Sequence, residues 1–335
     1  MKKLGLMGCG KVAEYGHLPM LKQVEQLELT ALFDPDLDRA SQMAEKFDAP
    51  FCTDDCQAFL ARDIDAVAIT SPAPAHLPNV AAAAAAGKGI LCEKPLAMSA
   101  EQAEQMKRIC DQAGVKLYTA FDYRFSPVAQ TIHRLINEGA IGRVGCLRLI
   151  YIWNLHGRYI FESGRKIPQP RRVGRMEEGG PMVDCGVHQI DLARWWTGSE
   201  VTAIHAAGAW VEHFHAPDHV WLHMEHENAA HTTVEMSFSY CADVAEPIAR
   251  FSYELIGTDG LIRYDKREQV FEIRTAEGTR QLEFGHEKNF RGMYEAFAVA
   301  LETGQDAALP TAHDGAEAVR ISREATEMVI ASRRR

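Results

Sequence analysis

Short apolar runs alternate with amphipathic or alanine-rich stretches along the first 121 residues. The runs predict buried strands, and the stretches between them predict helices that end at turn signals such as Gly87 and Gly114. The predicted strands span residues 4–9, 27–33, 66–71, 89–92 and 115–121, and the predicted helices span residues 11–26, 36–47, 76–86 and 99–114. Strands that alternate with helices in this way form a parallel sheet with helices on both faces.

The hydrophobic period changes to two after residue 121. After a helix at 125–139, alternating segments predict strands at 144–153, 201–214, 220–227, 232–240, 251–256, 261–264, 270–274 and 280–284. Successive strands with glycine-containing turns indicate a large open, mostly antiparallel sheet. Further helices are expected at 180–198, 290–303 and 314–331. We therefore expect an α/β domain at 1–121 and an α+β domain at 122–335, with the last helix packing back on the first domain.

Composition narrows the classes of protein. The chain has 335 residues, enough for two domains, and 36 basic against 46 acidic residues give a net charge of −10. This charge disfavours nucleic acid and anionic membrane partners. The sequence has no apolar stretch of about 18 residues, which a membrane span needs, and no apparent signal peptide. We expect a cytoplasmic protein whose 8 cysteines are thiols.

The first strand leads into the turn Gly8-Cys9-Gly10-Lys11-Val12-Ala13, which fits the dinucleotide-binding pattern G-x-G-x-x-G/A. Gly8 permits the tight turn, Gly10 lets the backbone approach a pyrophosphate, and Ala13 permits close helix–strand packing. A position between a strand and a helix is the context that this motif requires. We therefore expect residues Gly8, Cys9, Gly10, Lys11 and Val12 to contact the cofactor.

The second strand ends at Asp34, 24 residues after Gly10. An acid at this position accepts hydrogen bonds from the ribose hydroxyls of NAD and repels the 2′-phosphate of NADP. Its structural alternative is an Asx turn before Pro35. Arg39 lies nearby in the sequence and could bind a 2′-phosphate. The prediction is therefore NAD, with NADP as the alternative.

Other polar residues follow later strands of the parallel sheet. Ser71, Pro72 and His76 follow the strand at 66–71, and Glu93-Lys94-Pro95 follows the strand at 89–92. Ligands of an open parallel sheet bind beyond the carboxyl ends of its strands, so we place these residues in the cofactor cleft. Together with the glycine turn and Gly179-Gly180…Asp184-x-x-x-His188, they give a chain that resembles the glucose–fructose oxidoreductase/inositol dehydrogenase/MocA family over nearly its whole length.

The resemblance implies an NAD(P)-dependent oxidoreductase acting on a sugar, polyol or cyclic polyol. It also implies that Lys94 faces nicotinamide and substrate, in some members through a cis proline peptide. The alternative for Lys94 is a solvated loop lysine. The sheet domain commonly mediates dimers or tetramers in this family, so we expect a homo-oligomer.

The helix at 180–198 carries three ionisable residues on one face, since Asp184, His188 and Asp191 stand at i, i+4 and i+7. Such groups on a buried helix must pair with one another or act on a ligand. A purely structural cluster is the alternative. By resemblance, His188 is the general acid/base, Lys94 stabilises charge on the reacting oxygen, and Asp184 binds a substrate hydroxyl.

Other candidates lie between the two motifs. Asp122 stands where the family often carries asparagine and is expected near the nicotinamide ribose, and Arg124 and Trp153 are candidate substrate contacts as well as structural ones. Basic residues crowd the segment 158–175. This run is either solvated or, with Arg171 as its test residue, binds an anionic sugar.

Histidines also crowd the second domain, at 205, 213, 215, 219, 223, 226 and 231. Because no carboxylate or cysteine pattern accompanies them, we expect a decorated sheet face and no functional metal. Two alternatives to a dehydrogenase remain at this stage. One is an NAD-requiring glycosidase of the same superfamily, and the other is a non-catalytic regulator that binds the dinucleotide.

Overall fold

A computed structural model describes residues 1–306 and 308–333. The chain packs into two compact units. Unit 1 comprises Met1–Ser126 and Lys288–Val319, and unit 2 comprises Pro127–Glu287 and Arg320–Arg335.

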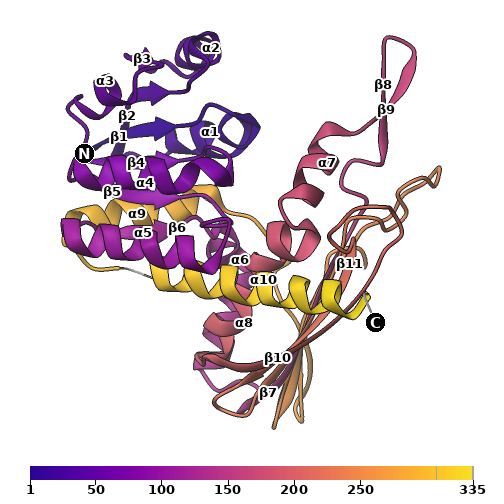
Figure 1. The fold of residues 1–335 in the computed structure, drawn as a ribbon. Helices are drawn as coiled ribbons and strands as arrows, with labels where there is room; N and C mark the ends of the chain where they lie inside the picture. The colour runs from indigo at the N-terminus through magenta and orange to yellow at the C-terminus, as the bar shows by residue number, and fades with distance from the viewer. Residues whose placement is uncertain (307, 334–335) are drawn as a thin grey trace. The chain divides into compact units, whose positions relative to one another are not determined.

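Unit 1 is built on a six-stranded sheet in the order β3-β2-β1-β4-β5-β6. Its strands are β1 (Lys2–Met7), β2 (Leu27–Phe33), β3 (Cys52–Thr53), β4 (Ala66–Ile69), β5 (Gly89–Cys92) and β6 (Leu117–Thr119). Every neighbouring pair is parallel, which confirms the predicted sheet. The central strands β4 and β5 are apolar along their whole length, as expected for strands that have helices on both faces (Figure 1).

Two helices of unit 1, α2 and α5, begin where the sequence predicts them to begin. Asp36 caps α2 by accepting from the Arg39 amide, Ser99 caps α5 by accepting from the Gln102 amide, and Gly114 ends α5 in the left-handed conformation. The helical segments are η1 (Ala13–His17), α1 (Leu18–Leu21), α2 (Leu37–Phe47), α3 (Cys56–Leu60), η2 (Ala73–Ala75), α4 (His76–Ala85), α5 (Ala100–Ala113), η3 (Asp122–Phe125) and α9 (Phe290–Thr303), with α10 (Ala312–Arg333) shared by both units. The first helix ends at Leu21 rather than at residue 26, and η1 within it is π-helical.

The segment Lys288–Val319 joins unit 1 although it lies far along the chain. Tyr294 and Phe297 of α9 belong to the same buried cluster as Leu4 and Leu6 of β1. Val319 of α10 joins the cluster on the opposite face of the sheet. A single cut after residue 121 therefore leaves out part of the core of the first unit.

Unit 2 is built on an eight-stranded sheet in the order β10-β11-β12-β7-β13-β14-β15-β16. Its strands are β7 (Val144–Ile152), β10 (Val201–Ala209), β11 (His219–His226), β12 (His231–Ser237), β13 (Arg250–Gly257), β14 (Gly260–Asp265), β15 (Val270–Thr275) and β16 (Gly278–Gln281). All pairs are antiparallel except β12 with β7, so the predicted mostly antiparallel sheet is confirmed. Its helical segments are α6 (Pro127–Asn137), α7 (Pro170–Glu177), η4 (Met182–Gly186) and α8 (Val187–Thr197).

Three strand or loop predictions in unit 2 differ from the structure. The strand predicted to reach residue 214 ends at Ala209, because the amides of Val211 and Glu212 donate to the buried Asp218 carboxylate instead of a strand neighbour. The last strand lies at Gly278–Gln281 rather than at 280–284. The basic segment 158–175, read as a loop, contains the hairpin β8 (Tyr159–Glu162) and β9 (Arg165–Pro168) and the start of α7.

All eight cysteines are free, as predicted. Within the described ranges, none of the helices is both long and apolar enough to cross a membrane.

Candidate active site

The turn after β1 has the geometry of a phosphate-binding loop. Gly8 has a φ of +103°, and its amide donates to the Phe33 carbonyl at 2.7 Å. A Cβ at Gly8 would lie 2.4 Å from the Ser71 nitrogen, so both the conformation and the close approach to the end of β4 require glycine. A Cβ at Gly10 would meet nothing within 4 Å, and the helix begins directly after it. The backbone at Gly10 therefore leaves room for a ligand at a helix N-terminus.

Cys9, between the two glycines, has a buried thiol. Burial, with a smaller contribution from Asp34, raises the pKa of the Cys9 thiol to about 12. The thiol therefore stays neutral and adds no negative charge beside a pyrophosphate. Lys11 is exposed and Val12 half-buried at the start of the following helix.

Asp34 is buried at the end of β2 and holds the glycine turn in place. Its Oδ2 accepts from the Cys9 amide at 2.7 Å, and its Oδ1 accepts from the Asp36 amide at 3.0 Å. The second bond is the Asx turn foreseen as the structural alternative. Each carboxylate oxygen can accept more than one hydrogen bond, so the turn leaves acceptor capacity for a ribose hydroxyl. Arg39 lies 3.7 Å from Asp34 and 3.1 Å from Asp36, so its charge is shared between two acids.

Hydrogen bonds tie the loops that follow β1, β4 and β5 to one another. The Thr70 hydroxyl donates to the Gly8 carbonyl at 2.6 Å. The buried His76 ring places Nε2 2.9 Å from the Ser71 carbonyl and Nδ1 3.0 Å from the Leu96 carbonyl. Burial lowers the pKa of His76, so the neutral ring donates one hydrogen bond and contacts the other carbonyl without one, and it lies between the Ser71-Pro72 loop and the Glu93–Leu96 loop. Lys94 is consequently held at the edge of the sheet that carries the glycine turn.

A buried, hydrogen-bonded chain of three side chains ends at the backbone amide of Lys94. Tyr294 Oη lies 2.6 Å from His17 Nδ1, and His17 Nε2 lies 2.9 Å from Glu93 Oε1. The other oxygen of Glu93 accepts from the Lys94 amide at 3.1 Å. Burial alone would raise the pKa of the Glu93 carboxyl, but the hydrogen bond and charge of His17, together with Lys94, lower it below its ordinary value. Glu93 is therefore an anion that fixes the Lys94 backbone. The Lys94–Pro95 peptide bond is cis.

In unit 2 the segment η4–α8 carries Asp184, His188 and Asp191, all buried. The residues Val183, Val187 and Ile190 are buried as well, so the segment is enclosed on every side rather than along one stripe. Asp184 lies in the π-helical turn η4, in which the rotation per residue about the helix axis is smaller than in an α-helix. The four-residue separation between Asp184 and His188 therefore does not place them on one face of a regular α-helix.

Arg175 of α7 is a partner of Asp184 that the sequence did not reveal. Its Nε lies 3.7 Å from Asp184 Oδ1, and its Nη1 contacts Glu178. Burial opposes the charge of Arg175, but Asp184 and Glu178 outweigh it and raise the pKa of the guanidinium. Asp184 thus sits as an anion beside a fixed cation. The sequence signal was only one arginine among many in the segment 158–175.

The basic segment is largely neutralised within unit 2. Arg158 pairs with Glu212 and Asp243, and the fully buried Arg172 pairs with Glu212 and donates to two backbone carbonyls. Arg171, the candidate substrate contact, is exposed. This arrangement favours a structural role for the charge run rather than an anionic substrate.

Replacing Arg171 by alanine is expected to leave KM for neutral and acidic sugars within about twofold, because an exposed arginine contributes little. Replacing its neighbour Arg172 by alanine should destabilise the chain by about 3–5 kcal/mol, since the Asn154 and Phe238 carbonyls would lose their donor and Glu212 would keep only Arg158 as its partner. Steady-state kinetics and urea unfolding measure the two effects. A tenfold rise in KM for a sugar acid in Arg171→Ala would instead favour the anionic substrate.

The remaining candidates divide between the two units. Arg124, in unit 1, is buried in an ion pair with Asp314 at 3.2 Å, which accounts for it structurally. Trp153, in unit 2, stacks on Tyr151, and its Nε1 is buried without a hydrogen-bond partner in the described part of the chain. Gln189, which the sequence did not single out, is fully buried next to His188, and its amide likewise lacks a partner there.

Two family models match most of the chain. An NAD-binding Rossmann-fold model of oxidoreductases matches residues 2–121, and the C-terminal domain model of the same GFO/IDH/MocA group matches residues 129–263. The chain belongs to the GFO/IDH/MocA oxidoreductase family. It is an NAD(P)-dependent oxidoreductase with an NAD-binding Rossmann fold.

Similar proteins within this family are named dehydrogenases. The chain is 29% identical to D-apiose dehydrogenase of Paraburkholderia graminis, over 83% of the chain and 71% of that protein. It is 27% identical to an NAD⁺-dependent scyllo-inositol 2-dehydrogenase of Bacillus subtilis, over 83% and 78%. A solved Agrobacterium radiobacter oxidoreductase, in complex with NAD⁺, L-tartaric acid and magnesium, is 20% identical and covers 100% of the chain and 97% of its own, with a TM-score of 0.82.

The residues of unit 1 fit the cofactor of this GFO/IDH/MocA chain. The open space at Gly10 is where a side chain would block a pyrophosphate, and Asp34 keeps acceptor sites at the end of β2. Gly8, Gly10 and Asp34 would hold the dinucleotide, with Lys94 held at the same edge of the sheet.

Asp122 is buried, which is unusual for an acid. Burial, the largest cause, raises the pKa of Asp122 from about 3.8 to about 7, and Glu93 adds to the rise while Lys288 and Lys94 oppose it. Between about pH 4 and 7 the folded chain therefore holds a proton that the unfolded chain has released. The free energy of unfolding falls across that window as pH rises and levels off above it.

Replacing Asp122 by asparagine is expected to remove this fall in the free energy of unfolding with rising pH, because an amide of the same shape has no proton to release. Relative to the parent, the variant should gain stability between pH 4 and pH 7 and keep the gain at pH 8. Urea unfolding at several pH values measures it, with the exposed Asp111→Asn as a matched control. A stability difference that is the same at pH 4 and pH 8 would show that Asp122 does not titrate in this way.

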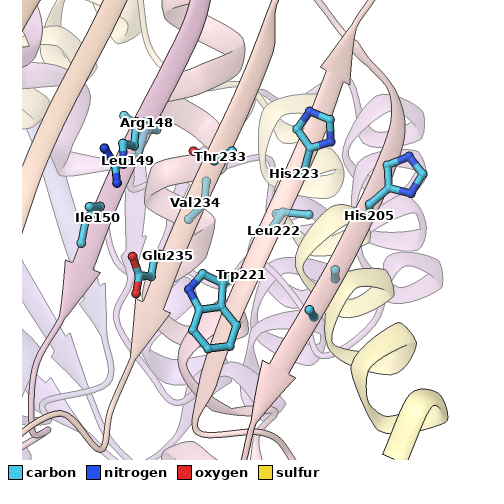
Figure 2. Close-up of a pocket in the computed structure, with 12 residues that line it drawn as sticks. Arg148, Leu149, Ile150, His205, Trp221, Leu222, His223, Thr233, Val234 and Glu235 are labelled. Atoms are coloured by element: carbon cyan, nitrogen blue, oxygen red, sulfur yellow. The ribbon is translucent and has the colours of Figure 1, made fainter.

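A hollow of about 630 Å³ lies elsewhere, on the face of the unit 2 sheet shown in Figure 2. Its lining includes Arg148, His205, Trp221, His223 and Glu235, and neither Asp184 nor His188. We therefore do not assign it to the substrate of the oxidoreductase.

Proposed function

We propose that this chain transfers hydride between NAD and a CH–OH group of a neutral sugar or cyclic polyol. The observation that carries the proposal is the set of hydrogen bonds that locks the Lys94 loop to the glycine turn through Thr70 and His76. These contacts support the proposal because they hold the backbone of the Lys94 loop beside the loops that follow β1 and β4. The names of the similar dehydrogenases support the substrate class.

In this proposal NAD, when bound, supplies the hydride acceptor. Bound NAD would be held by Gly8, Gly10 and Asp34 and would accept the hydride from the substrate carbon, while the His188 imidazole would accept the hydroxyl proton, so that a carbonyl is left. Lys94 donates a hydrogen bond to the reacting oxygen and stabilises its developing negative charge. His188 returns the proton when the reaction runs in reverse.

Asp184 and its neighbours are proposed to bind the rest of the substrate. The Asp184 carboxylate accepts from a substrate hydroxyl, and the Arg175 guanidinium lies 3.7 Å from that carboxylate. The buried Trp153 Nε1 and the Gln189 amide are polar groups that a polyhydroxylated ligand can satisfy. Because the basic residues of 158–175 that lie inward are already paired, the substrate proposed is uncharged.

We further propose that NAD is preferred to NADP. Asp34 lies at the end of β2, where its negative charge would repel a 2′-phosphate, and Arg39 is already shared between Asp34 and Asp36. Fluorescence titration with NADH and NADPH tests this preference. Tighter binding of NADPH would reverse the assignment.

A panel of aldoses, apiose, inositols and sugar acids, monitored at the reduced-nicotinamide absorbance, tests the reaction. Net formation of NADH with a sugar or inositol supports the dehydrogenase. Cleavage of a glycoside without net NADH would identify an NAD-requiring glycosidase, and tight binding of NADH without turnover on any substrate would identify a regulator.

We also propose that the chain forms a homodimer or homotetramer through the face of the unit 2 sheet that carries the hollow. Trp221 and Ile256 are exposed on the sheet, and large exposed apolar side chains around a hollow are typical of interaction surfaces. Light scattering after gel filtration should give a mass of two or four chains, and Trp221→Glu should lower it. A parent protein that is monomeric at micromolar concentration would contradict the proposal.

A further inference from the structure

A cluster of histidines and one glutamate lies on the same sheet face, on strands β10, β11 and β12. His205 stands directly opposite His223, and His231 stands directly opposite Glu225. His223 and Glu225 are two residues apart on β11, so they point to the same face. Figure 2 shows the rings of His205 and His223 projecting side by side from neighbouring strands.

The ligand atoms of this cluster already have the spacing of a metal site. One ring nitrogen each of His205 and His223 and one oxygen of Glu225 lie within 4.8 Å of one another. His205 Nε2 and Glu225 Oε1 are 3.4 Å apart. Ligands bound tetrahedrally at about 2.0–2.2 Å from a metal are themselves separated by about 3.4 Å. A small rotation of His223 would therefore complete a three-ligand site.

We propose that His205, His223 and Glu225 bind a divalent transition metal of the zinc class. Two imidazoles with one carboxylate favour Zn²⁺, Co²⁺, Ni²⁺ or Cu²⁺ over Mg²⁺ and Ca²⁺, which prefer oxygen ligands. His231 Nδ1 lies 3.1 Å from His223 Nε2 and adds either a further nitrogen or a bond that orients His223. The bound ion would join the edge strand β10 to β11 through side chains.

The sequence alone did not indicate this group because His205 lies 18 residues before His223, on another strand. The expectation of no metal rested on the lack of an accompanying carboxylate, and it is the pairing of β10 with β11 that brings Glu225 to His205. A second pair on the same face, His219 with Glu235 at 3.1 Å, belongs to no group of three ligands in the described residues. It supplies a matched control.

The test is metal binding by the purified full chain after treatment with EDTA. Calorimetric titration with Zn²⁺ should give one site per chain with a Kd of micromolar or lower, and Co²⁺ should give the visible absorption of a tetrahedral N/O site. His205→Ala, His223→Ala and Glu225→Gln should each weaken binding at least about tenfold. His219→Ala should leave binding unchanged, and circular dichroism checks that each variant is folded.

A Kd near or above a millimolar, or equal weakening by His219→Ala and by the three ligand variants, would overturn the site. Binding that survives all three ligand substitutions would place the metal elsewhere and overturn it as well. The readout is independent of turnover, so failure of the proposed dehydrogenase activity would leave this test intact.

Discussion

Replacing Lys94 by methionine is expected to lower kcat by about 10²–10³-fold while leaving the affinity for NADH within about twofold. Methionine keeps the length of the stem but removes the ammonium group, so the reacting oxygen loses the donor that stabilises its charge. The loss concerns the transition state more than the bound cofactor, because the pyrophosphate and ribose contacts are proposed to lie at Gly8, Gly10 and Asp34. Steady-state kinetics on the best substrate of the panel, with NADH fluorescence titration, measures both quantities.

Two comparisons make this result specific. Lys116→Met removes an exposed lysine of unit 1 that pairs with Asp306 at 3.1 Å, and it should leave kcat unchanged. Lys94→Arg keeps the charge but replaces a compact ammonium by a planar guanidinium, and it should recover only part of the rate. If Lys94→Met turns over at the parental rate, Lys94 is a solvated loop residue and the proposed mechanism fails.

Replacing His188 by asparagine is expected to lower kcat by about 10²–10⁴-fold, because asparagine can form a hydrogen bond but cannot accept the hydroxyl proton. The parent should oxidise its substrate more slowly as pH falls, since a protonated imidazole cannot act as a base. The variant should lose this dependence. Initial rates between pH 5 and 9, at saturating NAD, provide the measurement.

The exposed His215→Asn is the matched control in unit 2 and should retain the parental rate and pH profile. Asp122 also changes protonation in this range, since its pKa is raised to about 7, so Asp122→Asn has to be measured beside His188→Asn. If the acid limb disappears in Asp122→Asn and persists in His188→Asn, the base is not His188.

The sequence predicted the structure best where a local physical cause requires a particular residue. Gly8 needs a positive φ and meets the backbone of Ser71, and Ser99 and Gly114 mark the ends of a helix through caps that act locally. The parallel sheet followed from short apolar runs between helices. In each case the cause lies within a few residues of its effect, so a single sequence contains it.

The sequence was least informative where the cause is a partner far along the chain. Nothing in the segment 158–175 distinguishes the buried Arg172 from the exposed Arg171, because the acid that decides it, Glu212, lies 40 residues away. Arg175 and Asp184 are only nine residues apart, but they lie on two separate helical segments, α7 and η4, and the sequence does not show that these segments bring them together. The π-helical turns η1 and η4 were read as ordinary α-helix, since their apolar pattern does not reveal the altered hydrogen bonding.

The chain from Tyr294 through His17 to Glu93 gives the late helix α9 a part in positioning Lys94. A gene fragment that stops at residue 126 would encode every strand of the nucleotide-binding sheet and still omit this support, together with the aromatic side chains that complete the core. Recombination between relatives therefore has to exchange the beginning and the end of the coding sequence as a pair. The first unit is continuous in space but comes from two segments of the chain, so a single crossover does not transfer the whole unit.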